Sequence, residues 1–312
     1  MSVGTIDETV LAAYRRELHI HCYRLLANFD EAEDAAQETL TKAWQARDSF
    51  GAAGNARAWL YRIATNVCLD RMRQVKTLDR SFAEVPWLQP YPDALLDEPA
   101  ELVIARETIE LAFLSVIQLL PPRQRAVLIL RDVLEWSAVE TAEALEMTVP
   151  AVTSALQRAR ATIADKRPPN TPPSSYEQQL LAGFIDAHER MDADASLAMV
   201  REDIRITMPP DSMLFEGREQ MRRLFGLARE MGEWRLIPAW VNRMPAAVSY
   251  LKRPGDTEFR PFKVDVLRAD GDQIAETTTF DARLVAWIGL PATLALDHGA
   301  EPSLTQRSNR ST

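Results

Sequence analysis

The sequence has few cysteines and no long apolar run, and each absence excludes a class of protein. Cys22 and Cys68 are the two cysteines in 312 residues, so they offer no disulfide framework and fit a reducing compartment. No stretch reaches the roughly 18 consecutive apolar residues that a membrane-spanning helix needs. The N-terminal stretch carries acids where a secretory signal carries bases. We therefore expect a cytoplasmic protein without membrane contact.

The sequence also lacks the basic surplus that is typical of nucleic-acid-binding proteins. Its 36 basic and 45 acidic residues give a formal net charge of −9. That total averages over bands of opposite sign, because residues 57–80 hold six bases against two acids and residues 84–110 hold seven acids against one base. A DNA duplex responds to charge within a Debye length of about 8–10 Å. The acidic total therefore does not exclude DNA binding.

A metal centre is not expected. The stretch ELHIHC places His19 and His21 two residues apart, and on a helix such residues point to nearly opposite sides. No Cys-x-x-Cys pair completes a ligand set. We predict neither a metal nor a cofactor.

Two proline-rich segments divide the chain. KRPPNTPPSS at 166–175 contains four prolines in ten residues, and residues 85–101 contain four more. Proline ends helices and favours extended spacers, and the polar stretch 297–312 has the composition of a disordered tail. The predicted domains are 8–80, 102–167 and 176–296, joined by linkers at 81–101 and 168–175.

The first domain has helical periodicity. Apolar residues from Leu11 to Phe29 recur every three or four positions, which predicts a first helix. Asn28 or Asp30 is expected to cap a second helix, with Trp44 on its apolar side. A third helix follows, with Trp59, Ile63 and Val67 predicted to face inward.

The second domain contains two short helices joined by a tight turn. SAVETAEAL is expected to form a helix that begins at Ser137, and Thr148 is expected to cap the next one. Pro150 is tolerated in a first helical turn. This spacing is typical of a helix-turn-helix.

The third domain changes character along its length. Helical patterns through Val200 and from Glu219 to Arg229 give way to β-rich runs: WRLIPAWVNR, AAVSYLKRP, FRPFKVDVLRA and DQIAETTTFD. Helices followed by a meandering antiparallel sheet predict an α+β fold.

The second helix of the helix-turn-helix carries side chains suited to DNA. Early residues of such a helix face base edges, and later bases face phosphates. Thr153, Ser154 and Gln157 fit the first role, and Arg158 and Arg160 fit the second. Val152, Leu156 and Ile163 would be buried. The alternative is an ordinary helical hairpin with arginines on its surface.

Two further surfaces have both a functional and a structural interpretation. The helix 57–74 combines aromatic residues with four arginines, which suits melted DNA, although a solvated amphipathic helix has the same pattern. Glu31, Asp34 and Glu38 form an acidic face, which is either simply solvated or a docking surface for a basic partner.

The order of these features resembles the extracytoplasmic-function class of the bacterial sigma-70 family. The similar stretches are DEAEDAAQETLTKAW, ARAWLYRIATNVCLDRMR and LPPRQRAVLILRDVLEWSAVETAEALEMTVPAVTSALQRARA, about half of the chain. The resemblance implies two all-α sigma modules, a region 2 helical bundle and a region 4 helix-turn-helix. It implies core RNA polymerase and promoter DNA as partners, with region 4 on the β flap, and no enzymatic activity.

The resemblance also implies roles by position. The residues that match the grip on the β′ coiled coil of polymerase are Asp34, Gln37, Glu38 and Trp44. The loop 50–55 matches a loop that captures a flipped base. The −10 positions are Asn55, Arg57, Trp59, Arg62, Asn66, Arg71 and Arg73. The −35 positions are Thr148, Thr153, Ser154, Gln157, Arg158 and Arg160.

Residues 176–290 are similar to the SnoaL-like domains, cystatin-like α+β cones. The resemblance implies regulation in cis and a pocket that could take an unknown small ligand, with Trp234, Trp240, Phe262 and Phe280 as candidate lining residues. Enzymes also use this cone, and the acid–base candidates here are Asp186, His188, Asp211 and Asp281. Two alternatives therefore stay open: a ligand-responsive helix-turn-helix regulator, and a cone-fold isomerase or cyclase.

Overall fold

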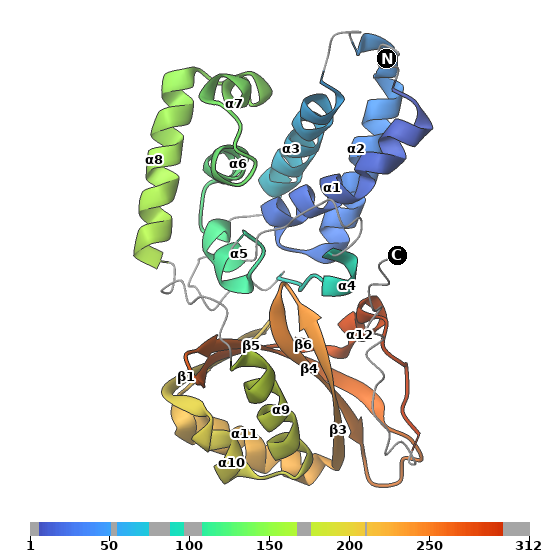
Figure 1. Ribbon diagram of the computed structural model, residues 1–312, viewed down its shortest axis with the longest axis vertical. Helices are drawn as coiled ribbons and strands as arrows, with labels where there is room; N and C mark the ends of the chain where they lie inside the picture. The colour runs from blue at the N-terminus through green and yellow to red at the C-terminus, as the bar shows by residue number, and fades with distance from the viewer. Residues whose placement is uncertain are drawn as a thin grey trace, which may run out of the picture. The chain divides into compact units, whose positions relative to one another are not determined.

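The computed structural model describes residues 6–50, 55–74, 88–96, 108–166, 176–209 and 211–295. The chain divides into two compact units (Figure 1). The first contains residues 1–172 together with 208–213 and 241–243, and the second contains the remainder. The predicted linker 168–175, the tail 297–312 and residues 51–54 of the predicted base-capturing loop lie outside the described residues.

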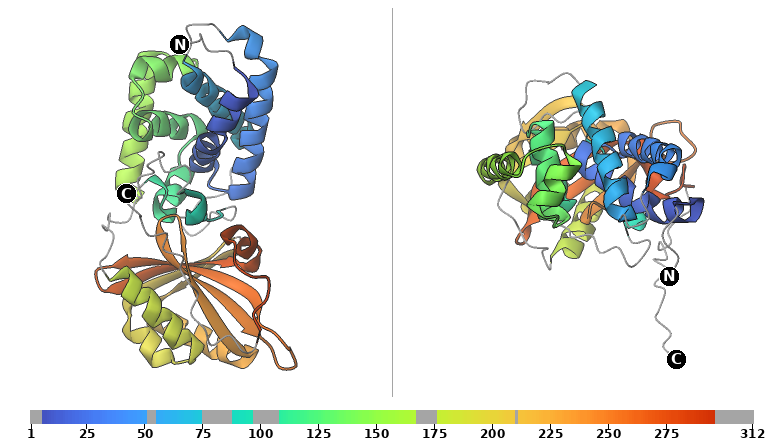
Figure 2. Two further views of the ribbon diagram at one scale, coloured as in Figure 1. Left: turned by 45° about the vertical axis from the view of Figure 1, so that its right-hand side comes forward. Right: turned by 90° about the horizontal axis from the view of Figure 1, so that it is seen from above.

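The first unit begins with three helices that pack against one another: α1 (Glu8–Leu26), α2 (Phe29–Gln45) and α3 (Ala56–Gln74), with the short η1 (Arg47–Ser49) after α2. Asp7 caps α1 by accepting the Val10 N–H. Asn28 caps α2 by accepting the Glu31 N–H, which confirms one of its two predicted caps. Figure 2 shows the three helices from two further directions.

The buried stripe of α3 differs from the predicted one. Leu60, Tyr61 and Val67 are buried, whereas Trp59 and Ile63 are only half-buried. Trp59 instead packs against Phe50, with the ring centroids 5.1 Å apart. Val67 is therefore buried as predicted, whereas Trp59 and Ile63 face only partly inward, because the neighbouring Leu60 and Tyr61 fill the core.

The first unit continues with α4 (Asp93–Leu96), α5 (Leu111–Gln118), α6 (Pro122–Leu128), the π-helical turn η3 (Ile129–Val133), α7 (Ala138–Ala144) and α8 (Val149–Lys166). Ser137 and Glu140 cap α7 reciprocally, as a capping box. Glu146 takes a left-handed conformation, with φ of 52°, in the turn before α8. α6 and α7 both pack against α8, so the predicted helix-turn-helix is confirmed.

Arg125 joins α6 to the end of α1. Its side chain is only 3% exposed, and Nη1 donates to the Leu25 carbonyl at 2.7 Å. Nη2 donates to the carbonyls of Gln118 and Leu120 at 2.9 and 3.3 Å. The last carbonyls of a helix have no partner within it, and Arg125 supplies one for Leu25. The two predicted sigma modules therefore share a buried polar connection.

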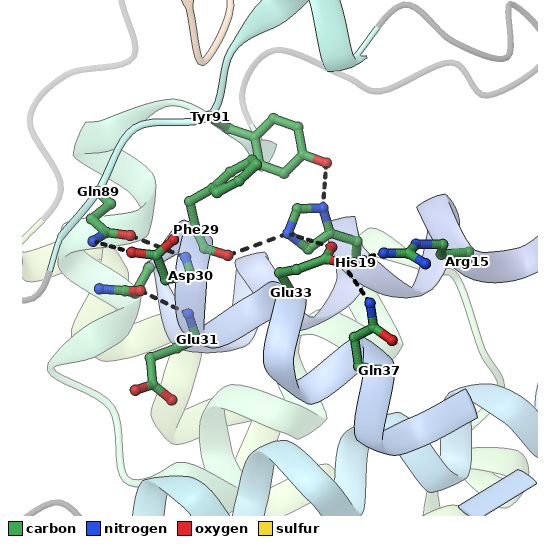
Figure 3. A network of polar contacts seen from close by, with 10 residues as sticks. Arg15, His19, Phe29, Asp30, Glu31, Glu33, Gln37, Gln89 and Tyr91 are labelled. Atoms are coloured by element: carbon green, nitrogen blue, oxygen red, sulfur yellow. Dashed lines mark hydrogen bonds and ion pairs between the residues drawn. The ribbon is translucent and has the colours of Figure 1, made fainter. Parts of the chain in front are cut away.

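Part of the predicted linker 81–101 is tightly bound in the first unit. The Tyr23 hydroxyl donates to the Gln89 carbonyl at 2.8 Å, and the Gln89 N–H donates to the Ala27 carbonyl at 3.0 Å. Figure 3 shows Tyr91 joined to His19 at one edge of a polar network. His19 Nε2 lies 3.3 Å from the Phe29 carbonyl and Nδ1 lies 2.8 Å from the Tyr91 hydroxyl. Burial lowers the pKa of His19, so the neutral ring donates from Nε2 and accepts at Nδ1.

Asn242, in the segment 241–243 of the first unit, completes the same region. It is fully buried, and its Oδ1 accepts the Tyr91 N–H at 2.7 Å. Its Nδ2 donates to the Ile109 carbonyl at 2.7 Å and to the Tyr23 hydroxyl at 2.9 Å. Its φ of 54° is one that asparagine tolerates better than most residues. Every polar atom of this side chain is thus used inside the first unit.

The second unit is a sheet with helices against it, apart from the strand residues 208, 211–213 and 241, which belong to the first unit. Its helices are α9 (Glu177–Glu189), α10 (Ala193–Ala198), α11 (Gly217–Met231), η4 (Ala282–Leu284) and α12 (Val285–Ile288). The strands are β1 (Val200–Met208), β2 (Asp211–Glu216), β3 (Glu233–Val241), β4 (Met244–Lys252), β5 (Arg260–Asp270) and β6 (Gln273–Asp281). They form one sheet in the order β2-β1-β6-β5-β4-β3, and α9 packs against β4 and β5 (Figure 1). Two helical modules followed by an α+β domain confirm the predicted fold class.

The sheet departs from the prediction at its beginning. β1 and β2 were not predicted, and β1 pairs with β6 in parallel, so the sheet is not a simple antiparallel meander. Arg201, Glu202 and Asp203 hide the alternation at the start of β1, and the register shifts between Val200 and Arg205. A charged, irregular strand gives little period-2 signal in the sequence.

Candidate nucleic-acid interface

All six residues predicted to contact the −35 element lie on the exposed side of α8 or at its start. Thr148 accepts the Ala151 N–H at 3.3 Å through its hydroxyl, as an N-cap does. Val152, Leu156 and Ala159 are buried on the opposite side, and Ile163 is half-buried rather than buried. The exposed set is Thr148, Thr153, Ser154, Gln157, Arg158 and Arg160.

The two arginines of α8 differ in their partners. Arg160 makes a bidentate pair with Asp132, with Nε–Oδ2 and Nη2–Oδ1 distances of 2.9 and 2.7 Å. Asp132 raises the pKa of Arg160 by hydrogen bonding and by its charge. Arg158 makes no ion pair with any residue that the structure describes. Arg158 is therefore available to a phosphate, whereas Arg160 is already neutralised.

The predicted −10 helix shows the same division. Arg57 pairs with Glu17, and Arg73 pairs with Asp70 at 2.7 Å. Arg62 and Asn66 are exposed and have no side-chain partner among the described residues. Asn55 caps the start of α3 by accepting the Ala58 N–H at 3.2 Å, and Trp59 is half-buried beside Phe50.

Arg71 connects the predicted −10 helix with the predicted polymerase-binding helix. It donates to Glu31 at 3.0 Å and to Glu38 at 3.1 Å. Lys42 pairs with Glu38 as well, at 2.8 Å. Hydrogen bonds from Lys42 and Arg71 lower the pKa of Glu38. Glu38 and Arg71 thus offset each other's charge in this conformation.

The remainder of the predicted polymerase surface is open. Asp34 and Gln37 are exposed, and the Gln37 amide donates to Glu33 at 3.1 Å. Trp44, predicted on the apolar side, is 39% exposed and stacks with Arg47, whose guanidinium lies 4.3 Å from the ring centroid. The sequence interpretation missed Arg47, although its position three residues after Trp44 is a usable signal.

The described residues contain no group of three or more His, Cys, Asp or Glu side chains placed to hold a metal ion. His21 donates from Nε2 to Thr65 at 2.8 Å, because the Thr65 hydroxyl itself donates to the Tyr61 carbonyl. Within the described part of the chain, no helix is both long enough and apolar enough to cross a membrane.

The acid–base candidates of the second domain have separate surroundings. Asp186 pairs with Arg190, and Asp281 pairs with Arg283, both at 2.5 Å. Asp211 is exposed. Burial lowers the pKa of His188 to about 4. Of the aromatic candidates, Trp234 meets Phe262 edge to face at 5.2 Å, Phe280 is buried and Trp240 is half-buried.

Comparison with known proteins gives matches over both helical modules and over most of the chain. The family model for Sigma-70 region 2 matches residues 10–77, and the model for Sigma-70, region 4 matches residues 110–163. The chain is 39% identical over 308 residues to the ECF RNA polymerase sigma factor SigG of Mycobacterium tuberculosis, covering 90% of this chain and 83% of that protein. It is 33% identical over 156 residues to the ECF RNA polymerase sigma factor SigW of Bacillus subtilis, covering 48% of this chain and 83% of that one.

A solved structure resembles nearly the entire chain. The crystal structure of the Mycobacterium tuberculosis extracytoplasmic function sigma factor SigJ matches with a TM-score of 0.66 at 20% identity. The match covers 92% of this chain and all of that one (100%). At this identity the likeness concerns the fold. Together with the family models, it confirms the resemblance drawn from the sequence.

Proposed function

The chain belongs to the ECF RNA polymerase sigma factors, which act in transcription initiation at promoters, and from this premise we propose which surfaces perform that function. The observation that carries the proposal is the distribution of unpaired polar side chains. Asp34 on α2, Arg62 on α3 and Arg158 on α8 are exposed and have no side-chain partner among the described residues. Each stands on a helix that the family resemblance assigns to a different contact.

The proposed contact with core RNA polymerase is the outer side of α2. Asp34, Gln37, Glu38 and Trp44 would bind the β′ coiled coil, and region 4 would bind the β flap. Acidic and aromatic side chains on one exposed surface suit a basic partner that also buries apolar area.

The first test is retention of free core polymerase by the immobilised full-length chain, without promoter DNA. Wild-type protein should retain the core, and Asp34→Lys should weaken retention by at least about tenfold, because it reverses a charge at an interface. The matched control is Asp186→Lys, an exposed aspartate on α9 in the second unit. If the wild-type chain does not retain the core, the polymerase proposal is wrong.

The proposed promoter contacts lie on α3 and α8. On α3, Arg62 and Asn66 would meet the −10 element first, with Asn55, Arg57, Trp59, Arg71 and Arg73 around them. On α8, Thr153, Ser154 and Gln157 would meet −35 base edges, Thr148 and Arg158 would contact the backbone, and Arg160 would follow once released from Asp132. Core polymerase supplies part of the affinity, so a net charge of −9 does not oppose this function.

We further propose that residues 176–296 modulate the sigma function in cis and bind a small ligand, and that the protein works in the cytoplasm. The proposed domain bounds remain 8–80, 102–167 and 176–296, with linkers at 81–101 and 168–175 and a tail at 297–312. A chain that ends at Lys166 also loses the Asn242 hydrogen bonds of the first unit, and it should retain polymerase but change promoter output in transcription with purified core. Its circular dichroism must first match that expected for α1–α8. Identical output from the two chains would exclude modulation.

The two alternative functions have less support. A helix-turn-helix regulator that works without polymerase has no use for the exposed α2 surface. An isomerase or cyclase needs a converging acid–base pair, whereas Asp186 and Asp281 are each engaged by an arginine. We therefore propose that the second unit is not catalytic.

A further inference from the structure

The start of α8 carries an exposed apolar side chain that packing in the helix-turn-helix does not explain. Val149, the first residue of α8, is 39% exposed, whereas Val152 and Leu156 are buried. Valine is a weaker helix former than alanine, so local propensity does not favour it there either. A single exposed valine is ordinary on a protein surface. Val149 differs in its position, because the first residues of the second helix of a helix-turn-helix face the bases of DNA.

Thr153 extends this apolar surface. Its hydroxyl donates to the Val149 carbonyl at 3.1 Å. The only donor of this side chain is therefore used by the helix backbone, and a methyl group and an oxygen acceptor remain for a partner. Thr153 is exposed, and residues four apart lie one above the other on the same side of a helix. Val149 and Thr153 thus form one exposed surface of methyl groups, which we call the methyl surface.

The polar side chains around the methyl surface differ in what they still offer. The Thr148 hydroxyl accepts the Ala151 N–H at 3.3 Å and so acts in capping the helix. Ser154 and Gln157 are exposed, and neither side chain has a hydrogen-bond partner among the described residues. The exposed side of α8 therefore begins with apolar groups and continues with polar groups whose hydrogen-bonding capacity is free.

The major groove of DNA offers an apolar group that fits such a surface. Each base pair presents a pattern of donors and acceptors there, and thymine adds its C5 methyl group. Methyl groups of side chains contact this methyl, and the contact removes apolar area from water. We infer that the methyl surface contacts thymine methyl groups in the −35 element, which makes Val149 a specificity-determining residue. The inference rests on the proposed promoter contact of α8 and names the base that its first turns select.

A protein partner is the competing occupant of the methyl surface, and the composition of this part of α8 favours DNA. The residues that dominate binding energy between proteins are mostly Trp, Tyr and Arg, whereas Val, Ser and Thr are under-represented among them. Val149, Thr153 and Ser154 belong to the second group. Arg158, which is exposed and has no ion-pair partner among the described residues, supplies the charge that a phosphate needs. Apolar, polar and cationic groups along one helix suit a groove that displays methyl groups, base edges and phosphates.

The size of the effect follows from the area that one methyl group buries. Burial of one carbon of this kind changes an affinity by a factor of about four. Uracil lacks the C5 methyl of thymine but keeps the same base pairing and the same hydrogen-bonding groups. Replacing a contacted thymine by uracil should therefore weaken DNA binding by about fourfold, and a thymine that is not contacted should show no such effect.

The test uses holoenzyme reconstituted from the full-length chain and core polymerase. The holoenzyme first selects duplexes from a randomised pool, and the upstream block of the selected sequence serves as the −35 element. The duplex is then made with deoxyuridine in place of thymidine within that block only. We expect binding to weaken by about fourfold for each contacted thymine. Equal affinity for the two duplexes, or an upstream block without thymine, would overturn the inference while promoter recognition stands. If the pool gives no selected sequence, the proposed promoter recognition is wrong as well.

Paired variants separate the methyl group of Thr153 from its hydroxyl. Thr153→Val keeps a methyl group and removes the hydroxyl, whereas Thr153→Ser does the reverse. Thr153→Val should keep the preference for thymine over uracil, and Thr153→Ser should lower it by up to about fourfold. The opposite result would show that the Thr153 hydroxyl reads the base, and it would contradict the inference.

A second pair of variants tests Val149. Val149→Ala should also lower the preference for thymine over uracil by up to about fourfold. The matched control is Val139→Ala, because Val139 is an equally apolar side chain on α7 and is 55% exposed. It should keep the full preference. If Val149→Ala instead weakens retention of core polymerase in the absence of DNA, the methyl surface contacts a protein and the inference is wrong. The comparison of thymine with uracil in the wild-type protein decides the matter even if a variant does not fold.

Discussion

The ion pair between Asp132 and Arg160 predicts how the affinity for DNA depends on salt concentration. Arg158 and Arg160 stand two residues apart on α8, but only Arg160 is held by a carboxylate. A phosphate contact releases counterions, so each contact contributes about −0.9 to the slope of log affinity against log salt concentration. In the wild-type protein we expect Arg158, and not Arg160, to contribute that term. Asp132→Asn should release Arg160 and add one contact.

The magnitude follows from the slope. Over a fourfold increase in salt, such as from about 50 to 200 mM, one contact changes affinity by about 3.5-fold. Arg158→Ala should therefore make the slope shallower by about 0.9, Arg160→Ala should leave it almost unchanged, and Asp132→Asn should make it steeper by about 0.9. The Asp132–Arg160 pair is on the surface, with side chains 30% and 61% exposed, so its loss should cost at most about 1 kcal/mol of stability.

The assay is fluorescence anisotropy of a labelled promoter duplex with reconstituted holoenzyme at several salt concentrations. The double variant Asp132→Asn with Arg160→Ala closes the cycle and should return to the wild-type slope. The reasoning fails if Arg160→Ala lowers the slope as much as Arg158→Ala does, or if Asp132→Asn does not change it. If Arg158→Ala weakened DNA binding for one promoter sequence only, Arg158 would contact base edges rather than phosphates.

Three further predictions concern stability, measured by urea unfolding. Arg125→Met should destabilise the first unit by about 3–5 kcal/mol, because it leaves buried carbonyls without a donor; a loss under about 1 kcal/mol would contradict this. Burial lowers the pKa of His21 to about 3, below the usual 6.5, so the unfolded chain binds the extra proton. The contribution of neutral His21 to the free energy of unfolding is then fully present above pH 6.5, and it decreases by up to about 1.4 kcal/mol per pH unit as the pH falls toward 3. His21→Gln should make this dependence of the unfolding free energy on pH weaker. Gly232→Ala should destabilise the second unit by at least about 2 kcal/mol, because φ is 144° and a Cβ would lie 2.1 Å from the Lys252 carbonyl oxygen; Gly226→Ala, in open space on α11, should stabilise by about 1 kcal/mol.

The features that could be predicted from the sequence are those with local causes. The helix-turn-helix depends on the Ser137 capping box, a short turn and Pro150 in a first turn, all visible within a few residues. The exposed side of α8 follows from helical periodicity. The partial exposure of Trp59 was missed because Trp59 and Leu60 are both apolar, and only tertiary packing decides which one enters the core.

The features that could not be predicted depend on residues far apart in the chain. Arg160 and Asp132 are 28 residues apart, and Arg125 and Leu25 are 100 apart, so no local pattern joins them. The same holds for Arg71, whose partners Glu31 and Glu38 on α2 are 40 and 33 residues away in the sequence. The pair of Lys263 and Asp265 on β5 is an exception, because the charged residues of FKVDV stand inside an apolar strand, and a lysine and an aspartate two residues apart lie on the same side of a strand.

The parallel pairing of β1 with β6 has a consequence for how the protein is made. β1 ends at Met208, but the strand it pairs with is complete only at Asp281, close to the end of the second unit. The DNA-binding helices are already complete at Lys166, 115 residues earlier. At synthesis rates of about 5–20 residues per second, each new chain spends roughly 6–23 s with α1–α8 present and the β1–β6 ladder still unformed. During that interval the ribosome holds a sigma module whose attached sheet domain does not yet exist.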